Sequence, residues 1–224
     1  VGTDALGKSN YNASYNTAVG YNAMLNATTA TGTTAIGTQA LDALTTGAQN
    51  TALGASALGA STTASYNTAV GASALVVNTT GAQNTAVGAF ALQSNTTGSP
   101  NTALGYDALG DNTTAAGNTA VGWASLSKTT TGYANTAVGQ SALTANTTGF
   151  SNVAFGHNTL DASTTGDNNT ALGKSALSSN TTADSNTAVG TSALFTNTTG
   201  AFNAAMGNDA LRTNSTGGSN IAIG

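Results

Sequence analysis

A five-residue box, Asn-Thr-Ala-aliphatic-Gly, recurs every 17 residues without insertion or deletion from Asn16 to Gly224. The boxes begin at residues 16, 33, 50, 67, 84, 101, 118, 135, 152, 169, 186, 203 and 220. A fixed short period is typical of chains that stack one structural unit many times. We therefore expect residues 1–224 to form one continuous array, and we expect this array to be a fragment of a longer one. Such a chain lacks a single central pocket, so its function is sought in assembly and contact more than in catalysis.

Each repeat is numbered here from its Asn as position 1. Position 1 is Asn in twelve of thirteen boxes, while position 3 is Ala and position 5 is Gly in all thirteen. Position 4 is always large and apolar, position 8 is mostly Ala, and position 9 is Leu except for Met24. Positions 13 to 15 almost always read Thr-Thr-Gly or Thr-Thr-Ala, and positions 6, 7, 10, 11, 16 and 17 vary.

The box has the pattern of a short β-strand. Residues at positions 2 and 4 are β-branched or otherwise apolar, and the period of two places them on one face of a strand, with position 3 on the other. Gly at position 5 ends the strand where the chain turns. No segment between the turns is long enough for a helix, and Thr, Asn and Gly lower helix propensity. The pattern predicts an all-β parallel β-solenoid, a β-roll or β-helix, with one 17-residue coil per repeat.

Two columns are expected inside this coil. The large residues of positions 4 and 9 are predicted to stack as the core, namely Val70, Leu75, Val87, Leu92, Val121 and Leu126. The amides of position 1 are predicted to form a ladder from coil to coil. Its members are Asn50, Asn67, Asn84, Asn101, Asn118 and Asn135.

The invariant Ala of position 3 leads to a further expectation. It lies opposite position 4 on the strand, yet it is as uniform as a packed residue, so we expect a second buried surface shared between chains. The residues assigned to this surface are Ala69, Ala86, Ala103, Ala120 and Ala137. A symmetric homo-oligomer would bury this column, and a homotrimer is the predicted state.

Composition excludes several functions. Only 5% of residues are charged and the net charge is −4, which disfavours nucleic acid as a partner. No stretch of 18 apolar residues occurs, so no membrane span is expected. His157 is the only histidine and stands at a variable position, and the repeated Gly-Gly-x-Gly-x-Asp pattern of calcium-binding rolls is missing. We therefore predict no catalytic residue, no cofactor and no metal site.

Three surface features remain as candidates. Asn-x-Ser/Thr sequons recur as a by-product of the repeat, and glycans on them would decorate one edge. They begin at Asn12, Asn26, Asn78, Asn95, Asn112, Asn146, Asn168, Asn180, Asn197 and Asn214. Threonine is abundant and charge is low, as in ice-binding solenoids, although a regular outward pair of Thr columns requires that position 2 takes part.

Aromatic residues at variable positions are the third feature. Tyr106 and Trp123 lie one repeat apart, as do Tyr133 and Phe150, so each pair is placed to stack on one edge. Exposed amphipathic rings favour contact with a glycan or a protein, while isolated surface rings are the commoner explanation.

The repeat resembles known families. The box Asn67-Thr-Ala-Val-Gly71 followed by Ala74-Leu75 resembles the head repeats of trimeric autotransporter adhesins. The same series continued by Asn78-Thr-Thr-Gly81 also resembles repeats of bacterial surface and phage tail-fibre-like proteins. The resemblance to the adhesin heads implies a parallel β-roll with three chains side by side. The period of 17 is longer than is usual for the adhesin heads.

Together these features predict a non-enzymatic, fibre-forming rod of an extracellular filament or surface adhesin. A phage tail-fibre shaft and an ice-binding solenoid are the alternatives. The expected location is extracellular, on a cell surface or in a virion fibre. The expected partners are further copies of the chain and a cell-surface glycan or protein.

Overall fold

The computed structural model describes residues 2–7 and 13–224, which contain strands and turns and no helix. The chain divides into two compact units, one ending at Thr114 and one running from Ala115 to Gly224. Each unit is a parallel β-solenoid with one 17-residue coil per repeat, which confirms the predicted fold class.

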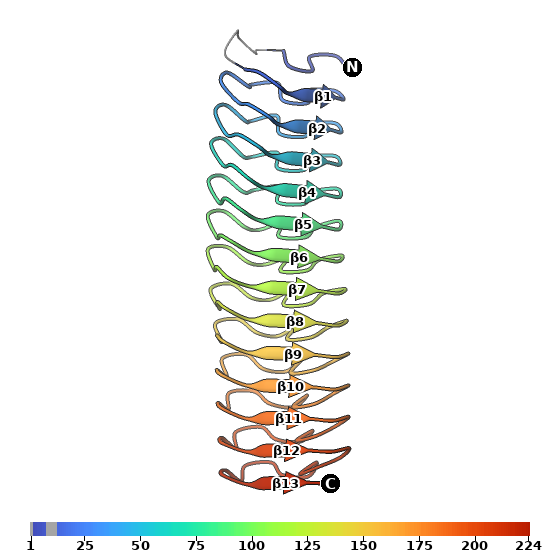
Figure 1. Cartoon of the computed structure of the whole chain (residues 1–224), viewed down its shortest axis with the longest axis vertical. Helices are drawn as coiled ribbons and strands as arrows, with labels where there is room; N and C mark the ends of the chain where they lie inside the picture. The colour runs from blue at the N-terminus through green and yellow to red at the C-terminus, as the bar shows by residue number, and fades with distance from the viewer. Residues whose placement is uncertain (1, 8–12) are drawn as a thin grey trace. The chain divides into compact units, whose positions relative to one another are not determined.

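Every coil contributes one three-residue strand made of positions 2 to 4. The first unit holds β1 (Thr17–Val19), β2 (Thr34–Ile36), β3 (Thr51–Leu53), β4 (Thr68–Val70), β5 (Thr85–Val87) and β6 (Thr102–Leu104). The second unit holds β7 (Thr119–Val121), β8 (Thr136–Val138), β9 (Val153–Phe155), β10 (Thr170–Leu172), β11 (Thr187–Val189), β12 (Ala204–Met206) and β13 (Ile221–Ile223). Within each unit, consecutive strands pair in parallel (Figure 1). Residue i lies opposite residue i+17, as in the pair Ala69 and Ala86.

Backbone hydrogen bonds also join the coils outside the strands. The N–H of Leu75 donates to the carbonyl of Ala91 at 3.0 Å, and the N–H of Thr79 donates to the carbonyl of Thr96 at 3.0 Å. The hydroxyl of Thr79 donates to the same Thr96 carbonyl at 3.1 Å, and this contact recurs along position 13. Coil stability therefore comes from stacked polar backbone as well as from apolar burial.

The interior of the coil differs from the sequence-based expectation at position 4. Leu75, Leu92 and Leu126 of position 9 are fully buried, but Val87 is 36% exposed. The side chains of Val70 and Val121 are also partly exposed. The assignment of position 4 to the core was wrong, because positions 2 and 4 both point away from the coil.

Position 3 is correspondingly inside. The five alanines assigned to contacts between chains are fully buried within their own unit: Ala69, Ala86, Ala103, Ala120 and Ala137. A 17-residue coil is narrow, so the leucine of position 9 fills it and the strand opposite has room only for a methyl group. The uniformity of the Ala column thus reflects packing inside each coil.

The Asn residues of position 1 form a ladder inside each unit. In the first unit, the Oδ1 atom of Asn67 accepts the backbone N–H of Asn84 at 2.9 Å, and Asn84 in turn accepts that of Asn101 at 2.8 Å. The Nδ2 of Asn67 donates to the Gly81 carbonyl of the same coil at 2.9 Å and to the Oδ1 of Asn50 at 3.3 Å. In the second unit, the backbone N–H and the Nδ2 of Asn135 both donate to the Oδ1 of Asn118. Each side chain therefore ties two coils together and also closes its own coil.

A second, less regular ladder runs along position 12. In the second unit the Nδ2 of Asn197 donates to the Oδ1 of Asn180 at 3.3 Å, and Asn214 repeats this contact with Asn197 at 3.1 Å. Ser163 interrupts the column between Asn146 and Asn180. Its Oγ and the Oδ1 of Asn146 are buried and have no hydrogen-bond partner among the described residues. A serine is too short to span the distance between coils that asparagine spans.

The interrupted ladder gives a prediction about stability. Replacing Ser163 by Asn is expected to supply a donor to Asn146 and an acceptor to Asn180, raising the free energy of unfolding by about 1–2 kcal/mol. Thermal unfolding followed by circular dichroism measures the change. The matched variant Ser163→Ala removes the hydroxyl without satisfying Asn146, so its stability should stay within about 0.5 kcal/mol of the parent chain. Equal stability of the two variants would contradict the ladder explanation.

Candidate functional site

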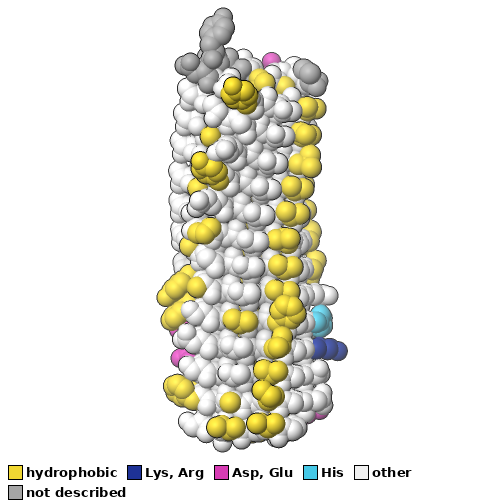
Figure 2. Space-filling model, viewed as in Figure 1, with side chains coloured by type: hydrophobic (Ala, Val, Ile, Leu, Met, Phe, Trp, Pro, Cys, Tyr) yellow, Lys and Arg dark blue, Asp and Glu magenta, His cyan; other side chains and the backbone are white. Residues whose placement is uncertain are grey.

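The side chains of positions 2 and 4 form the outward surface of the strands, here called the outer strand face. Its position-4 column is apolar throughout and substantially exposed, for example 45% at Leu53, 52% at Phe155 and 54% at Met206. In Figure 2 hydrophobic side chains form a column over the strands of each unit. An ordered, continuous apolar column of this kind marks a contact surface.

The outer strand face carries no charge, because neither column contains Asp, Glu, Lys, Arg or His. In the first unit, position 2 is threonine in all six strands: Thr17, Thr34, Thr51, Thr68, Thr85 and Thr102. Among the described residues, no hydroxyl of this column has a protein hydrogen-bond partner, in contrast to the satisfied hydroxyls of position 13 such as that of Thr79. These hydroxyls are therefore available to solvent or to a partner.

The outer strand face is more apolar in the second unit. Val153, Ala204 and Ile221 replace threonine at position 2 of β9, β12 and β13. A shallow hollow of about 110 Å³ lies on this face and includes Met206 and Ile223 among its lining residues. The added aliphatic groups enlarge the apolar surface of this face.

The four aromatic residues selected from the sequence lie at two edges of the strand face. Tyr133 and Phe150 stack in parallel, with ring centroids 5.0 Å apart and an angle of 3° between ring planes. Tyr106 of the first unit and Trp123 of the second are both about half exposed. Tyr106 meets Phe90, which the sequence interpretation did not select, edge-on at 5.6 Å.

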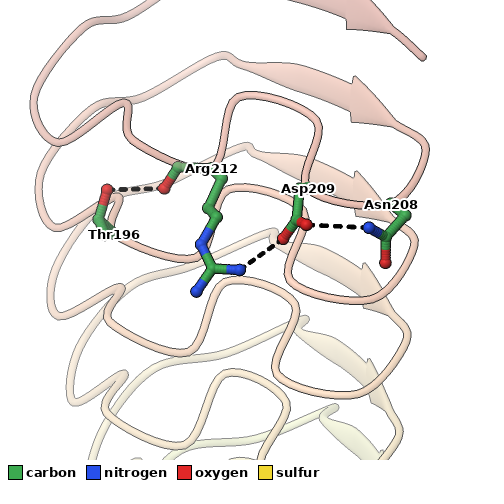
Figure 3. Close-up of polar contacts among 4 residues, drawn as sticks. All are labelled: Thr196, Asn208, Asp209 and Arg212. Carbon is green, nitrogen blue, oxygen red and sulfur yellow. Dashed lines mark hydrogen bonds and ion pairs between the residues drawn. The ribbon is translucent and has the colours of Figure 1, made fainter.

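Charged side chains occur on the variable edges of the coils. Figure 3 shows Arg212 and Asp209, whose Nη1 and Oδ1 atoms lie 2.7 Å apart, with the Nδ2 of Asn208 donating to the same carboxylate at 2.9 Å. The Thr196 hydroxyl donates to the Arg212 carbonyl at 2.7 Å, and the guanidinium lies 5.2 Å from the ring centroid of Phe195. Both ion-pair partners are about half exposed, so this pair contributes little to stability.

A second edge feature surrounds Asp42 in the first unit. This residue lines an open hollow of about 360 Å³ together with Gln39, Ser56, Val76 and Val77. Burial raises the pKa of the Asp42 carboxyl above its ordinary value, and backbone hydrogen bonds from Ala43 and from Asp42 itself oppose this shift. The hollow is shallow, and its only ionisable group is this carboxyl.

Metal-ligating side chains are scattered over the part of the chain that the structure describes. No group of three or more His, Cys, Asp or Glu side chains there could hold a metal ion. His157 is exposed on an edge of its coil. Over residues 2–7 and 13–224, no helix is long and apolar enough to cross a bilayer.

The sequons fall mainly inside the coil. Six of the ten acceptor asparagines are fully buried: Asn78, Asn95, Asn112, Asn146, Asn180 and Asn197. The Nδ2 of Asn78, the atom that a glycan would modify, donates to the Gly81 carbonyl at 2.9 Å. Regular glycosylation along this column of the folded coil is therefore excluded. Asn168 is exposed, and Asn12 lies outside the described residues.

Comparison of the chain with models of protein families, with curated proteins and with solved structures finds no match. The outer strand face and the edges beside it are the surfaces that bear on function.

Proposed function

We propose that the chain is the structural shaft of an extracellular fibre or surface adhesin, and that copies of it assemble as a homotrimer through the outer strand face. The exposed, uncharged apolar column at position 4 carries this proposal. Removing apolar surface from water contributes roughly 25 cal/mol per Å², and in a single chain this column remains in solvent. A second copy of the same chain presents the same repeat and therefore a matching column.

A trimer suits the width of this face. Positions 2 and 4 lie about 7 Å apart along a strand, so the face is only two side chains wide. Three such narrow faces, one from each chain, can pack around a common axis parallel to the direction of coil stacking. This arrangement brings equivalent residues of the three chains together at every coil. The resemblance of the repeat to trimeric adhesin heads supports the same number.

This proposal is tested by the mass of the protein in solution. Size-exclusion chromatography with multi-angle light scattering should give three times the chain mass of 21.6 kDa. The double variant Val87→Asp with Leu104→Asp places two charges on the outer strand face of neighbouring coils. It should shift the protein to monomer, because burying an unpaired carboxylate is costly.

A matched control adds the same charge away from this face. Thr80 and Thr97 occupy exposed position 14 in neighbouring coils. Thr80→Asp with Thr97→Asp should leave the trimer intact. A monomeric parent chain, or equal dissociation of both double variants, would overturn assembly through the outer strand face.

Ice binding is a second candidate, favoured by the threonine column of the first unit. Six outward hydroxyls repeat in register on consecutive strands, about 4.8 Å apart, beside a parallel column of aliphatic groups. Such an array presents hydroxyl and methyl groups to water at regular intervals, as a surface that binds an ice lattice requires. Because a trimer would bury this array, a monomeric protein that shows thermal hysteresis would support ice binding and contradict the shaft.

A further inference from the structure

An aromatic corner lies beside the outer strand face of the first unit, just after the glycine turns that follow β5 and β6. It is defined by Phe90, Gln93, Tyr106 and Asp107, which line a hollow of about 320 Å³. This volume falls at the lower end of the range for small-ligand sites. The hollow is open to solvent, and its walls come from two successive coils.

The two rings form walls at right angles. Their centroids are 5.6 Å apart, and the ring planes meet at 82°. The exposed fraction is 36% for Phe90 and 50% for Tyr106, so neither ring is buried in the core. The corner thus presents ring surface to solvent from two directions.

The backbone holds this corner in place. The N–H of Phe90 donates to the Ala72 carbonyl at 3.0 Å, and the N–H of Asp107 donates to the Ala89 carbonyl at 3.1 Å. These bonds belong to the regular set that joins successive coils. The rings and the carboxylate therefore stand on a rigid scaffold, which reduces the ordering cost of binding.

The polar side of the corner is acidic. The Nε2 of Gln93 donates to the Oδ1 of Asp107 at 3.4 Å and so helps to orient the carboxylate beside the rings. Residues 1–114 contain four Asp and one Lys, a formal charge of −3. The first unit is therefore net negative, and Asp107 places one of its carboxylates at the corner.

We propose that the aromatic corner binds a methylated ammonium group of the choline type. Aromatic faces attract such cations through the ring quadrupole, and perpendicular rings with a carboxylate are suited to a round, weakly hydrated cation. A sugar ring is flat and would favour a single open aromatic platform, which the perpendicular arrangement interrupts. The inference does not depend on how copies of the chain pack.

The test titrates the full chain with choline and with its neutral isostere 3,3-dimethyl-1-butanol, using ligand-observed NMR. Because the site is open, we expect choline to bind with a Kd on the order of 1 mM and the neutral isostere to bind about tenfold more weakly. Vesicles of phosphatidylcholine and of phosphatidylglycerol then distinguish a lipid headgroup from a soluble or glycan-linked choline group. Retention by the first alone indicates a lipid headgroup, and binding of soluble choline without vesicle retention indicates a free or glycan-linked headgroup.

Substitutions taken from the repeat itself test the residues. Phe90→Ser and Tyr106→Ala introduce residues that neighbouring coils carry at the same positions, as Ser73 and Ala89 do, so these variants should fold normally by circular dichroism. Each should weaken choline binding at least about fivefold, as should Asp107→Asn. Phe202→Ser removes an exposed ring of the second unit and should have no effect.

The proposal is overturned if choline and the isostere bind equally. It is also overturned if the three corner variants bind choline like the parent chain. Binding of a neutral monosaccharide such as glucose that depends on the same rings, without choline binding, would assign the corner to carbohydrate.

Discussion

Replacing Gly71 by alanine is expected to lower the free energy of unfolding by about 3–5 kcal/mol, a large effect for one methyl group. Gly71 has a φ of +135°, and a Cβ atom added there would lie 2.5 Å from the carbonyl oxygen and 2.6 Å from the carbonyl carbon of Gly88 in the next coil. The obstacle is backbone that cannot move without breaking the bond from the N–H of Gly88 to the Val70 carbonyl, which is 2.7 Å long. Thermal and denaturant unfolding measure the loss.

Gly32→Ala is the matched control for this prediction. Gly32 also has a positive φ, +63°, but a Cβ atom there would meet only the Cγ of Gln49 at 3.5 Å. The same position of later coils holds Gln49 and Tyr66 with φ values of 56° and 62°. The control should lose about 1 kcal/mol or less. Similar losses for the two alanine variants would show that conformational preference, and not contact between coils, explains the invariant glycine.

Replacing Ala86 by leucine is expected to destabilise the fold by about 3 kcal/mol or more. Ala86 is fully buried inside its coil, as is Leu92 of the same repeat. Overpacking of a dense interior forces side chains and backbone from their preferred positions. The damage should therefore be seen first in unfolding measurements by circular dichroism, at any protein concentration.

The adjacent variant Val87→Leu separates the two faces of the same strand. Val87 points outward, and β3 and β6 carry Leu53 and Leu104 at the same position. Its stability should change by less than about 0.5 kcal/mol. If Ala86→Leu kept full stability and lost only self-association by light scattering, the alanine column would belong to a surface between chains, contrary to its burial here.

The repeat predicted the local structure well. Strands occupy positions 2 to 4 of every box, and the chain turns at the glycine that follows. The asparagine of position 1 repeats along the chain because its amide joins one coil to the next, as between Asn67 and Asn84. These features depend on neighbouring residues and on a period of 17, both of which can be read directly.

The orientation of the strand was the main error. Size suggested that Val87 belongs inside and Ala86 outside, whereas the structure reverses both. One signal in the repeat pointed the other way. Position 4 varies from valine to Phe155 and Met206, a range of volumes that a close-packed interior does not accept, while position 3 never changes.

The sequence predicted only one residue of the aromatic corner. Tyr106 was selected as an aromatic residue at a variable position, one repeat from Trp123, but Phe90, Gln93 and Asp107 were not selected and stand at variable positions of two different repeats. Their juxtaposition depends on the stacking of coils and on the positive φ values of Phe90 and Asp107, 61° and 56°. Neither can be judged from residue types alone.

The sequence by itself determined the period, the strands, the glycine turns and the asparagine ladder, because each follows from local preference repeated at a constant interval. Only the tertiary structure decided which face of each strand is buried. Alternation separates position 3 from positions 2 and 4 without saying which side faces inward. That choice depends on the width of the closed coil, whose interior holds the leucine of position 9 and a methyl group and leaves the larger aliphatic side chains on the outer strand face.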